Sequence, residues 1–314
     1  MSDRSAFPPS ERCADCVALS GHSRWDIERD VIRGRGFDGG HKFLPDGLSL
    51  LDRMRCLSAA QARRLSQIQG RTYANMVALL ERFINAKALR ISQDHWLGDQ
   101  AAFEAFVRCS HDEIRHQALF TRIERMMAAG MPPGYRFGAE SDLLARAVLG
   151  ASAWAARGLA CHIGLCTQLH YRHSLPSDPS LSPLIKDVLR FHWQDEMQHA
   201  LLDELEWRRE DHRLGDLPRD GVVRELIDLL FAVDRVVQQQ AQADAAFFLA
   251  TEGAAFSTRQ TQWLNAGLLS AYRWQYLLCG LQDERFHQVL STLLAPMQLE
   301  RLRIATVPLF TPLI

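Results

Sequence analysis

Several features that would direct this chain of 314 residues to other structural classes are absent. No stretch of about 18 uncharged apolar residues occurs, so no membrane-spanning helix is expected. The most apolar long segment, 147–169, is interrupted by Arg157 and His162. Alternation of apolar and polar residues is absent over any useful length, so strands are not expected either.

Charge of one sign is also lacking. The 36 basic and 37 acidic residues give a formal net charge of −1, and the basic residues are scattered along the chain. This argues against binding to nucleic acid or to a membrane surface through charge. The opening residues MSDRSAFPPSER contain no apolar signal segment, and the seven cysteines are odd in number. We therefore expect reduced thiols and a cytoplasmic protein.

A short motif near the start, Cys13-x-x-Cys16 followed by His22, could suggest zinc. A closed tetrahedral site needs a second pair of ligands, and none lies close by. We interpret these residues as part of an irregular lead-in over residues 1–50, which is rich in glycine, proline and charge. The zinc site is the weaker alternative.

The rest of the chain has the residue pattern of a helical protein. From about Ser58, apolar residues recur at spacings of three and four, with glycine and proline confined to the breaks. This pattern predicts helices at 58–92, 100–129, 141–173, 182–211, 220–251, 257–279 and 282–297. We predict an all-α fold: a four-helix bundle over 51–213 and a C-terminal helical extension over 214–314. The final ATVPLFTPLI is expected to be irregular and to dock on the body or on a second subunit, as in a homodimer.

Two copies of the motif Asp-Glu-x-x-His contain side chains that can bind metal ions. One lies in the second long helix as Asp112-Glu113-x-x-His116, and the other in the fourth as Asp195-Glu196-x-x-His199. Glutamate and histidine three residues apart share one helix face, so each turn can offer an oxygen and a nitrogen to one metal ion. Two such turns facing each other can hold two ions inside a bundle.

Each motif also begins with an aspartate, which could orient a ligating imidazole on the opposite helix. Asp112 would then serve His199, and Asp195 would serve His116. On the fourth helix, His192 lies on the same face as Glu196, either as a further ligand or as a core histidine. Asp203, one turn beyond His199, is assigned to a charged helix end.

The first predicted helix contains one acidic residue. Glu81 is the only acidic residue between Asp52 and Asp94, and no lysine or arginine lies one turn away from it. It lies about 16 residues, or about 24 Å, from the turn near Gly98, as does Glu113 on the next helix. We therefore expect the two glutamates to lie level.

The third helix departs from this pattern, because no acid occurs between Asp142 and Asp178. If the third and fourth helices run antiparallel from a turn near Asp178, the residue of the third helix that lies level with Glu196 is close to Ala160. Coordinating side chains near that level are Cys161, His162 and Cys166. Of these we favour His162 as the metal ligand, with a core position as the alternative.

These residues resemble the ferritin-like di-iron carboxylate proteins, and most of all the branch that includes the p-aminobenzoate N-oxygenases. Glu81, Asp112-Glu113-x-x-His116 and His192-x-x-x-Glu196-x-x-His199 match the motifs of that branch over about residues 58–211. The branch's glutamate on helix three has no counterpart here. The resemblance implies a ferritin-like bundle with two iron ions, or manganese or a mixed pair, and an external electron donor.

The activity that the resemblance implies is oxidation by O₂ of a small organic substrate, such as an amine or aromatic amine. Two alternatives stay open: a ferroxidase or metal-binding protein, and a non-enzymatic helical bundle with a degenerate site.

Overall fold

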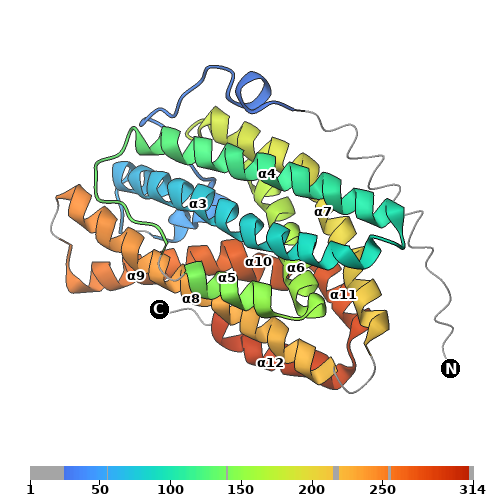
Figure 1. Cartoon of the computed structure of the whole chain (residues 1–314). Coiled ribbons are helices and arrows are strands. Elements are labelled where there is room, and N and C mark those ends of the chain that lie inside the picture. The colour runs from blue at the N-terminus through green and yellow to red at the C-terminus, as the bar shows by residue number, and fades with distance from the viewer. Residues whose placement is uncertain (1–24, 55, 139–140, 215–218, 254–255, 311–314) are drawn as a thin grey trace.

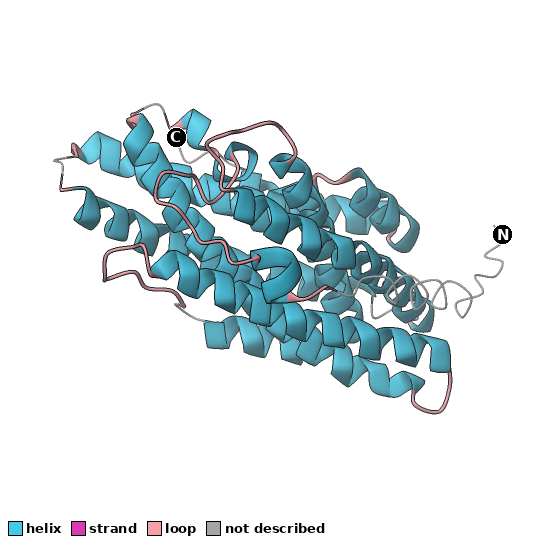
Figure 2. Cartoon of the chain, turned by 90° about the horizontal axis from the view of Figure 1, so that it is seen from above, coloured by secondary structure: helices cyan, strands magenta, loops and turns pink. Residues whose placement is uncertain are grey.

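The computed structural model describes residues 25–54, 56–138, 141–214, 219–253 and 256–310. Within these ranges the regular structure is helical, apart from one isolated bridge between Lys42 and Leu181. Figure 2 shows helices running through the whole body of the molecule. The prediction of an all-α fold is confirmed.

Four long helices form two antiparallel pairs. The first pair is α3 (Ala59–Ser92) with α4 (Gln100–Ala128), and the second is α6 (Ala153–Ser174) with α7 (Pro183–Arg213). Figure 1 shows α3 and α4 side by side across the upper part of the molecule, with α7 behind α4. The two pairs also contact each other between α4 and α7 and between α3 and α6.

Local signals set the ends of these helices. Ser58 accepts a hydrogen bond from the backbone N–H of Gln61 and forms a capping box, and Asp99 accepts one from Ala102. Pro183 occupies the first turn of α7, where a missing N–H costs nothing. The predicted bounds of these three helices differ from the observed ones by at most two residues.

The third predicted helix, 141–173, is wrong in one respect. The structure divides it into α5 (Ser141–Gly150) and α6, because Ser152 leaves the helical conformation and caps α6 by accepting from Ala155 N–H. Lys87 of α3 fixes this corner, since its ammonium group donates to the carbonyls of Leu149 and Ala151.

The C-terminal helices pack on the bundle. They are α8 (Arg219–Glu252), α9 (Thr258–Arg273), η4 (Trp274–Leu278), α10 (Cys279–Leu281), α11 (Glu284–Leu293) and α12 (Pro296–Phe310). Both α8 and α10 contact α6, and their apolar residues join the core of the bundle. The C-terminal extension therefore backs the helix that lacks an acid.

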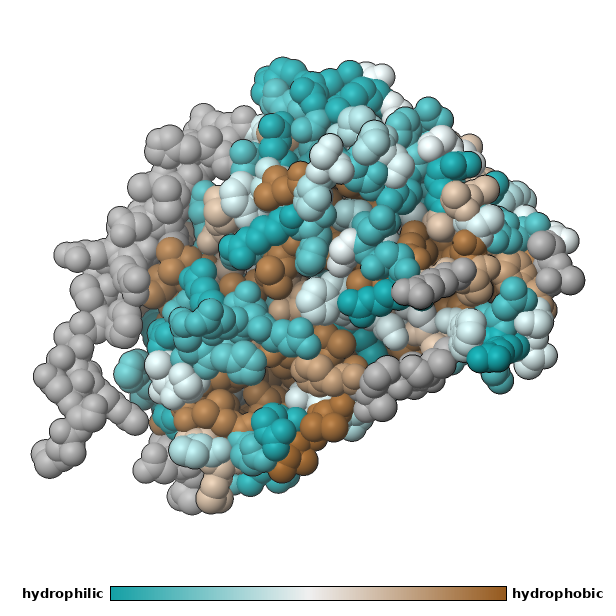
Figure 3. All heavy atoms as spheres, turned by 180° about the vertical axis from the view of Figure 1, so that it is seen from behind, coloured by the Kyte–Doolittle hydropathy of each residue, from teal (hydrophilic) through white to brown (hydrophobic). Residues whose placement is uncertain are grey.

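The final apolar segment is helical as far as Phe310, contrary to the expectation of an irregular tail, and residues 311–314 lie outside the described ranges. α12 continues to Phe310 with Pro308 inside it, and its Leu302 and Leu309 are buried against the body. Its other face exposes Met297, Ile304 and Val307. Figure 3 shows the rear face of the molecule, where hydrophobic residues gather mainly in the lower half between hydrophilic ones. A homodimer through such apolar surface stays a prediction.

The described part of the lead-in is more regular than expected. It forms η1 (Ile27–Ile32) and α2 (Asp46–Ser49), and it buries Leu44 and Leu48 completely. The short helix η2 (Leu51–Arg53) follows it. Cys13, Cys16 and His22 lie outside the described residues. No helix in the ranges that the structure describes is long and apolar enough to cross a membrane.

Candidate metal centre

Six side chains with metal-binding atoms converge inside the bundle. α3 supplies Glu81, α4 supplies Glu113 and His116, and α7 supplies His192, Glu196 and His199. They make up two groups of four, within each of which one ligand atom per residue lies no more than 4.8 Å from any other. The first group is Glu81, His116, His192 and Glu196, and the second is Glu113, His116, Glu196 and His199. His116 and Glu196 belong to both groups, so the two positions adjoin.

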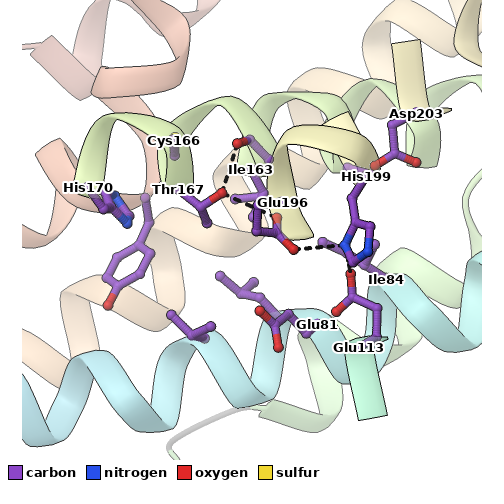
Figure 4. Close-up of a pocket in the computed structure, with 15 residues that line it drawn as sticks. Glu81, Ile84, Glu113, Ile163, Cys166, Thr167, His170, Glu196, His199 and Asp203 are labelled. Atoms are coloured by element: carbon purple, nitrogen blue, oxygen red, sulfur yellow. Dashed lines mark hydrogen bonds and ion pairs between the residues drawn. The ribbon is translucent and has the colours of Figure 1, made fainter. Parts of the chain in front are cut away.

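The helical spacing explains how so few turns supply this set. His192, Glu196 and His199 stand at i, i+4 and i+7 on α7, and Glu113 and His116 stand at i and i+3 on α4. Figure 4 shows Glu81, Glu113, Glu196 and His199 directed into the same space from three helices. Among the predicted ligands these six are brought together.

The contacts within the cluster are short. His192 Nε2 lies 2.6 Å from Glu81 Oε1, and His199 Nδ1 lies 2.9 Å from Glu196 Oε1 and 3.1 Å from Glu113 Oε1. His116 Nδ1 lies farther out, 3.6 Å from Glu196 Oε1. Both motif histidines therefore present Nδ1 to the cluster and turn Nε2 away from it.

Aspartates lie behind these two imidazoles. His116 Nε2 is 3.0 Å from Asp195 Oδ2, and His199 Nε2 is 3.6 Å from Asp112 Oδ2. Each aspartate thus faces the histidine of the opposite helix, the pairing that the sequence suggested. An aspartate on Nε2–H would leave the lone pair of Nδ1 free to bind a metal.

Two further residues join this arrangement and were not anticipated. Arg115 Nη2 donates to Asp112 Oδ1 and to Asp195 Oδ2, both at 2.8 Å, and so links the two aspartates. Trp25 Nε1 donates to Asp195 Oδ2 at 3.0 Å. Arg115 directly precedes His116 in the sequence, so its place beside the centre could have been predicted. Trp25 lies 170 residues from its partner in the chain and gave no such signal.

His162, favoured above as the ligand from the third helix, lies outside the cluster. Its Nε2 is 2.8 Å from the carbonyl oxygen of Leu277, and Gly280 packs against its ring. The C-terminal extension, which sequence patterns could not place, thus provides its partner. His162 is a core histidine in this structure.

The side chain of α6 that reaches the cluster is Thr167, which donates to Glu196 Oε2 at 3.2 Å. The expected level, near Ala160, was two turns away. A turn centred near Asp178 would pair Ala160 with Glu196, whereas the observed contacts pair Thr167 with Glu196 and Gly164 with Ala200. Gly164, whose Cα approaches Ala200, fixes the same register. Of the two cysteines near the expected level, Cys166 lines the cavity beside the cluster.

Burial shapes the protonation of the three glutamates. It raises the pKa of Glu81 to about 8 and that of Glu113 to about 7. Burial also acts to raise the pKa of Glu196, but the neighbouring histidines outweigh it and hold that pKa at about 2. A buried cluster of this kind cannot ionise all of its carboxyl groups without added positive charge.

The chemistry of the donor set fits a pair of divalent ions. Four buried atoms of the cluster have no hydrogen-bond partner among the described residues: Glu81 Oε2, Glu113 Oε2, His116 Nδ1 and His199 Nε2. Three of these are able to ligate a metal directly, and the fourth faces Asp112. Carboxylate oxygen with imidazole nitrogen suits iron, manganese or zinc. Metal binding would displace the protons that burial retains on Glu81 and Glu113.

A small cavity adjoins the cluster, with a volume of about 30 Å³. Its walls include Val77, Leu80 and Ile163 along with Glu81, Glu113, Glu196 and His199. Asp203 also lines it and pairs with Arg157 at 2.7 Å, so its assignment to a charged helix end was wrong. A water molecule needs about 10–15 Å³ by this measure, so the cavity has room for about two.

No protein-family model matches the chain, and no curated protein is significantly similar to it.

Proposed function

We propose that this protein is a non-haem di-iron oxygenase that uses O₂ to oxidise a small organic substrate, for which an amine or aromatic amine is the first candidate. The observation that supports it most is the pair of overlapping ligand groups, joined by Glu196 and His116. A single structural ion would need one group only. Two adjoining positions in a buried bundle suit chemistry in which two ions act on one molecule.

The side chains of the metal centre would have different roles. Two iron(II) ions bound there would supply the electrons that activate O₂, and an external donor would restore them. Glu81, Glu113 and Glu196 would neutralise the ions, while Asp112 and Asp195 would orient the two imidazoles. The apolar walls would exclude water from the reacting atoms. Thr167 holds Glu196 Oε2 by its hydroxyl hydrogen bond, on the helix where the resembled branch carries a glutamate.

Metal stoichiometry tests the proposal. Anaerobic titration with iron(II) should give two ions in the wild type and none in Glu196→Ala, which removes a ligand of both groups. Glu81→Ala and His199→Ala should each retain one ion, since each removes a ligand of one group. Wild-type protein that binds no iron, or variants that bind as well as wild type, would contradict it and favour a non-enzymatic bundle.

The small cavity favours a second function, that of a ferroxidase. A space for about two water molecules admits O₂ more readily than an aromatic ring. The reduced protein should therefore be mixed with O₂ with and without an amine such as aniline. Steady iron oxidation at the same rate with and without the amine would favour the ferroxidase. An oxygenated amine product would favour the oxygenase.

A further inference from the structure

Two buried cysteines from different helices lie against each other beside the metal centre. Cys166 belongs to α6 and Cys279 begins α10, and each is 1% exposed. Both are free cysteines, and their thiols share a side-chain hydrogen bond. The proposed function gives neither of them a role.

The packing of α10 on α6 holds this pair together. Gly280 directly follows Cys279, and a Cβ on it would lie 2.8 Å from Cys166 Sγ, an approach that glycine permits. Cys279 Sγ donates to the carbonyl oxygen of Gln275 at 3.2 Å and lies 4.0 Å from His170 Nε2. His170 stands four residues after Cys166, on the same face of α6. Both sulfur atoms therefore lie in one contact between α6 and α10.

Cys166 also lines the cavity of about 30 Å³ beside the ligand cluster, together with Glu81 and Glu196. This volume has room for about two water molecules, and hydrogen peroxide carries two oxygen atoms. A buried thiol ordinarily reacts slowly, because oxidants do not reach it. A thiol in the wall of such a cavity is within reach of an oxidant of this size.

We propose that Cys166 and Cys279 are a modification site, at which hydrogen peroxide converts the two thiols to a reversible disulfide. Peroxide first oxidises the Cys166 thiol to a sulfenic acid, its O–O bond breaks, and one water molecule leaves. The sulfur of Cys279 then attacks that of Cys166, the disulfide forms, and a second water molecule leaves. In total the thiols lose two electrons and two protons, and peroxide is reduced to two water molecules. The inference does not depend on the proposed function, because the oxidant comes from solution.

The neighbouring thiol decides how this oxidation ends. A sulfenic acid without a partner goes on to the irreversible sulfinic acid, whereas a second thiol in contact captures it as a disulfide. Burial raises the pKa of the Cys279 thiol well above its ordinary value, and the contact with Cys166 raises it further. Cys279 therefore stays protonated, and its attack is the slower step. The expected order of reaction is Cys166 first and Cys279 second.

Peptide mapping of metal-free protein tests the proposal. The folded chain is treated with hydrogen peroxide, the remaining thiols are alkylated, and the digest is examined by mass spectrometry, which distinguishes the seven cysteines. We expect peptides linked through Cys166 and Cys279, which dithiothreitol separates again. Cys56 is partly exposed, and its oxidation shows that the peroxide has acted. Cys166 and Cys279 that stay free thiols while Cys56 is oxidised would overturn the proposal.

Single substitutions then test the pairing and the order of reaction. Cys161→Ser is the matched control, since it changes another buried cysteine of α6, and it should form the link as wild type does. Cys279→Ser should leave a sulfenic acid on Cys166 that dimedone traps, and Cys166→Ser should leave Cys279 reduced. Cys279→Ala and Cys166→Ala take their place if a serine variant does not fold. A sulfenic acid on Cys279 in place of Cys166, or an equal yield of a link between Cys161 and Cys279, would refute the site.

Discussion

Removal of Asp195 should affect the protein far more than removal of Asp112, although the two occupy equivalent places in their motifs. Asp195 is 1% exposed, and its Oδ2 accepts from His116, Trp25 and Arg115 at 2.8–3.0 Å. Asp112 accepts from Arg115 at 2.8 Å and lies 3.6 Å from His199. The structure therefore makes the motif of α7 the more tightly held of the two.

The difference can be given a magnitude. Asp195→Ala takes the acceptor at Asp195 from Trp25 and His116, and removes one of the two carboxylates that Arg115 bridges, which costs about 3–5 kcal/mol of the free energy of unfolding. Asp112→Ala removes one hydrogen bond, from Arg115, and the longer contact with His199, and should cost about 1–2 kcal/mol. Urea unfolding of the metal-free variants measures both values.

Metal affinity adds a second readout. His116 belongs to both ligand groups, so Asp195→Ala should weaken both ions, each by about 10- to 100-fold. His199 belongs to one group, so Asp112→Ala should weaken one ion and leave the other unchanged. Anaerobic iron(II) titrations fitted to two sites distinguish these outcomes. Equal effects of the two variants on stability and on both ions would refute the reasoning.

Further predictions concern packing at Gly158, charge beside the metal centre at Thr167, and the buried acid Asp244. Gly158→Ala should lose about 1–3 kcal/mol of stability, because the added Cβ would lie 2.8 Å from the buried ring of Trp207. Thr167→Glu should lower the stability of metal-free protein, since it buries another acid beside the cluster, and should tighten metal binding. Burial raises the pKa of Asp244 to about 7. Its folded pKa exceeds the ordinary 3.8, so its contribution to stability is present at low pH and lost as the pH rises through about 7, by at most about 1.4 kcal/mol per pH unit.

Each of these predictions has a matched control. Gly221→Ala in α8 has nothing within 4 Å of the added Cβ and should gain about 0.5–1 kcal/mol, so a loss there would contradict the steric argument. Thr167→Gln has the size of glutamate without its charge and should leave metal affinity lower than Thr167→Glu does. The stability difference between wild type and Asp244→Asn isolates one group from Glu81 and Glu113. A difference that does not vary between pH 4 and 8 would show that Asp244 is ionised throughout.

The pattern of apolar residues determined the helices, because spacings of three and four are local and each helix forms its hydrogen bonds within itself. The same spacing put Glu113 with His116, and His192 with Glu196 and His199, on single helix faces. Glu81 could be selected because it was the one acid on its helix and no lysine or arginine lies one turn away from it. These inferences needed only the chain within a turn or two of each residue.

Tertiary structure decided what depends on distant parts of the chain. His162 bonds to Leu277 of the C-terminal extension, and Thr167 of α6 meets Glu196 of α7. Trp25 reaches Asp195 from a lead-in that has no periodic pattern. Such contacts arise from packing between segments up to 170 residues apart, and no local spacing encodes them.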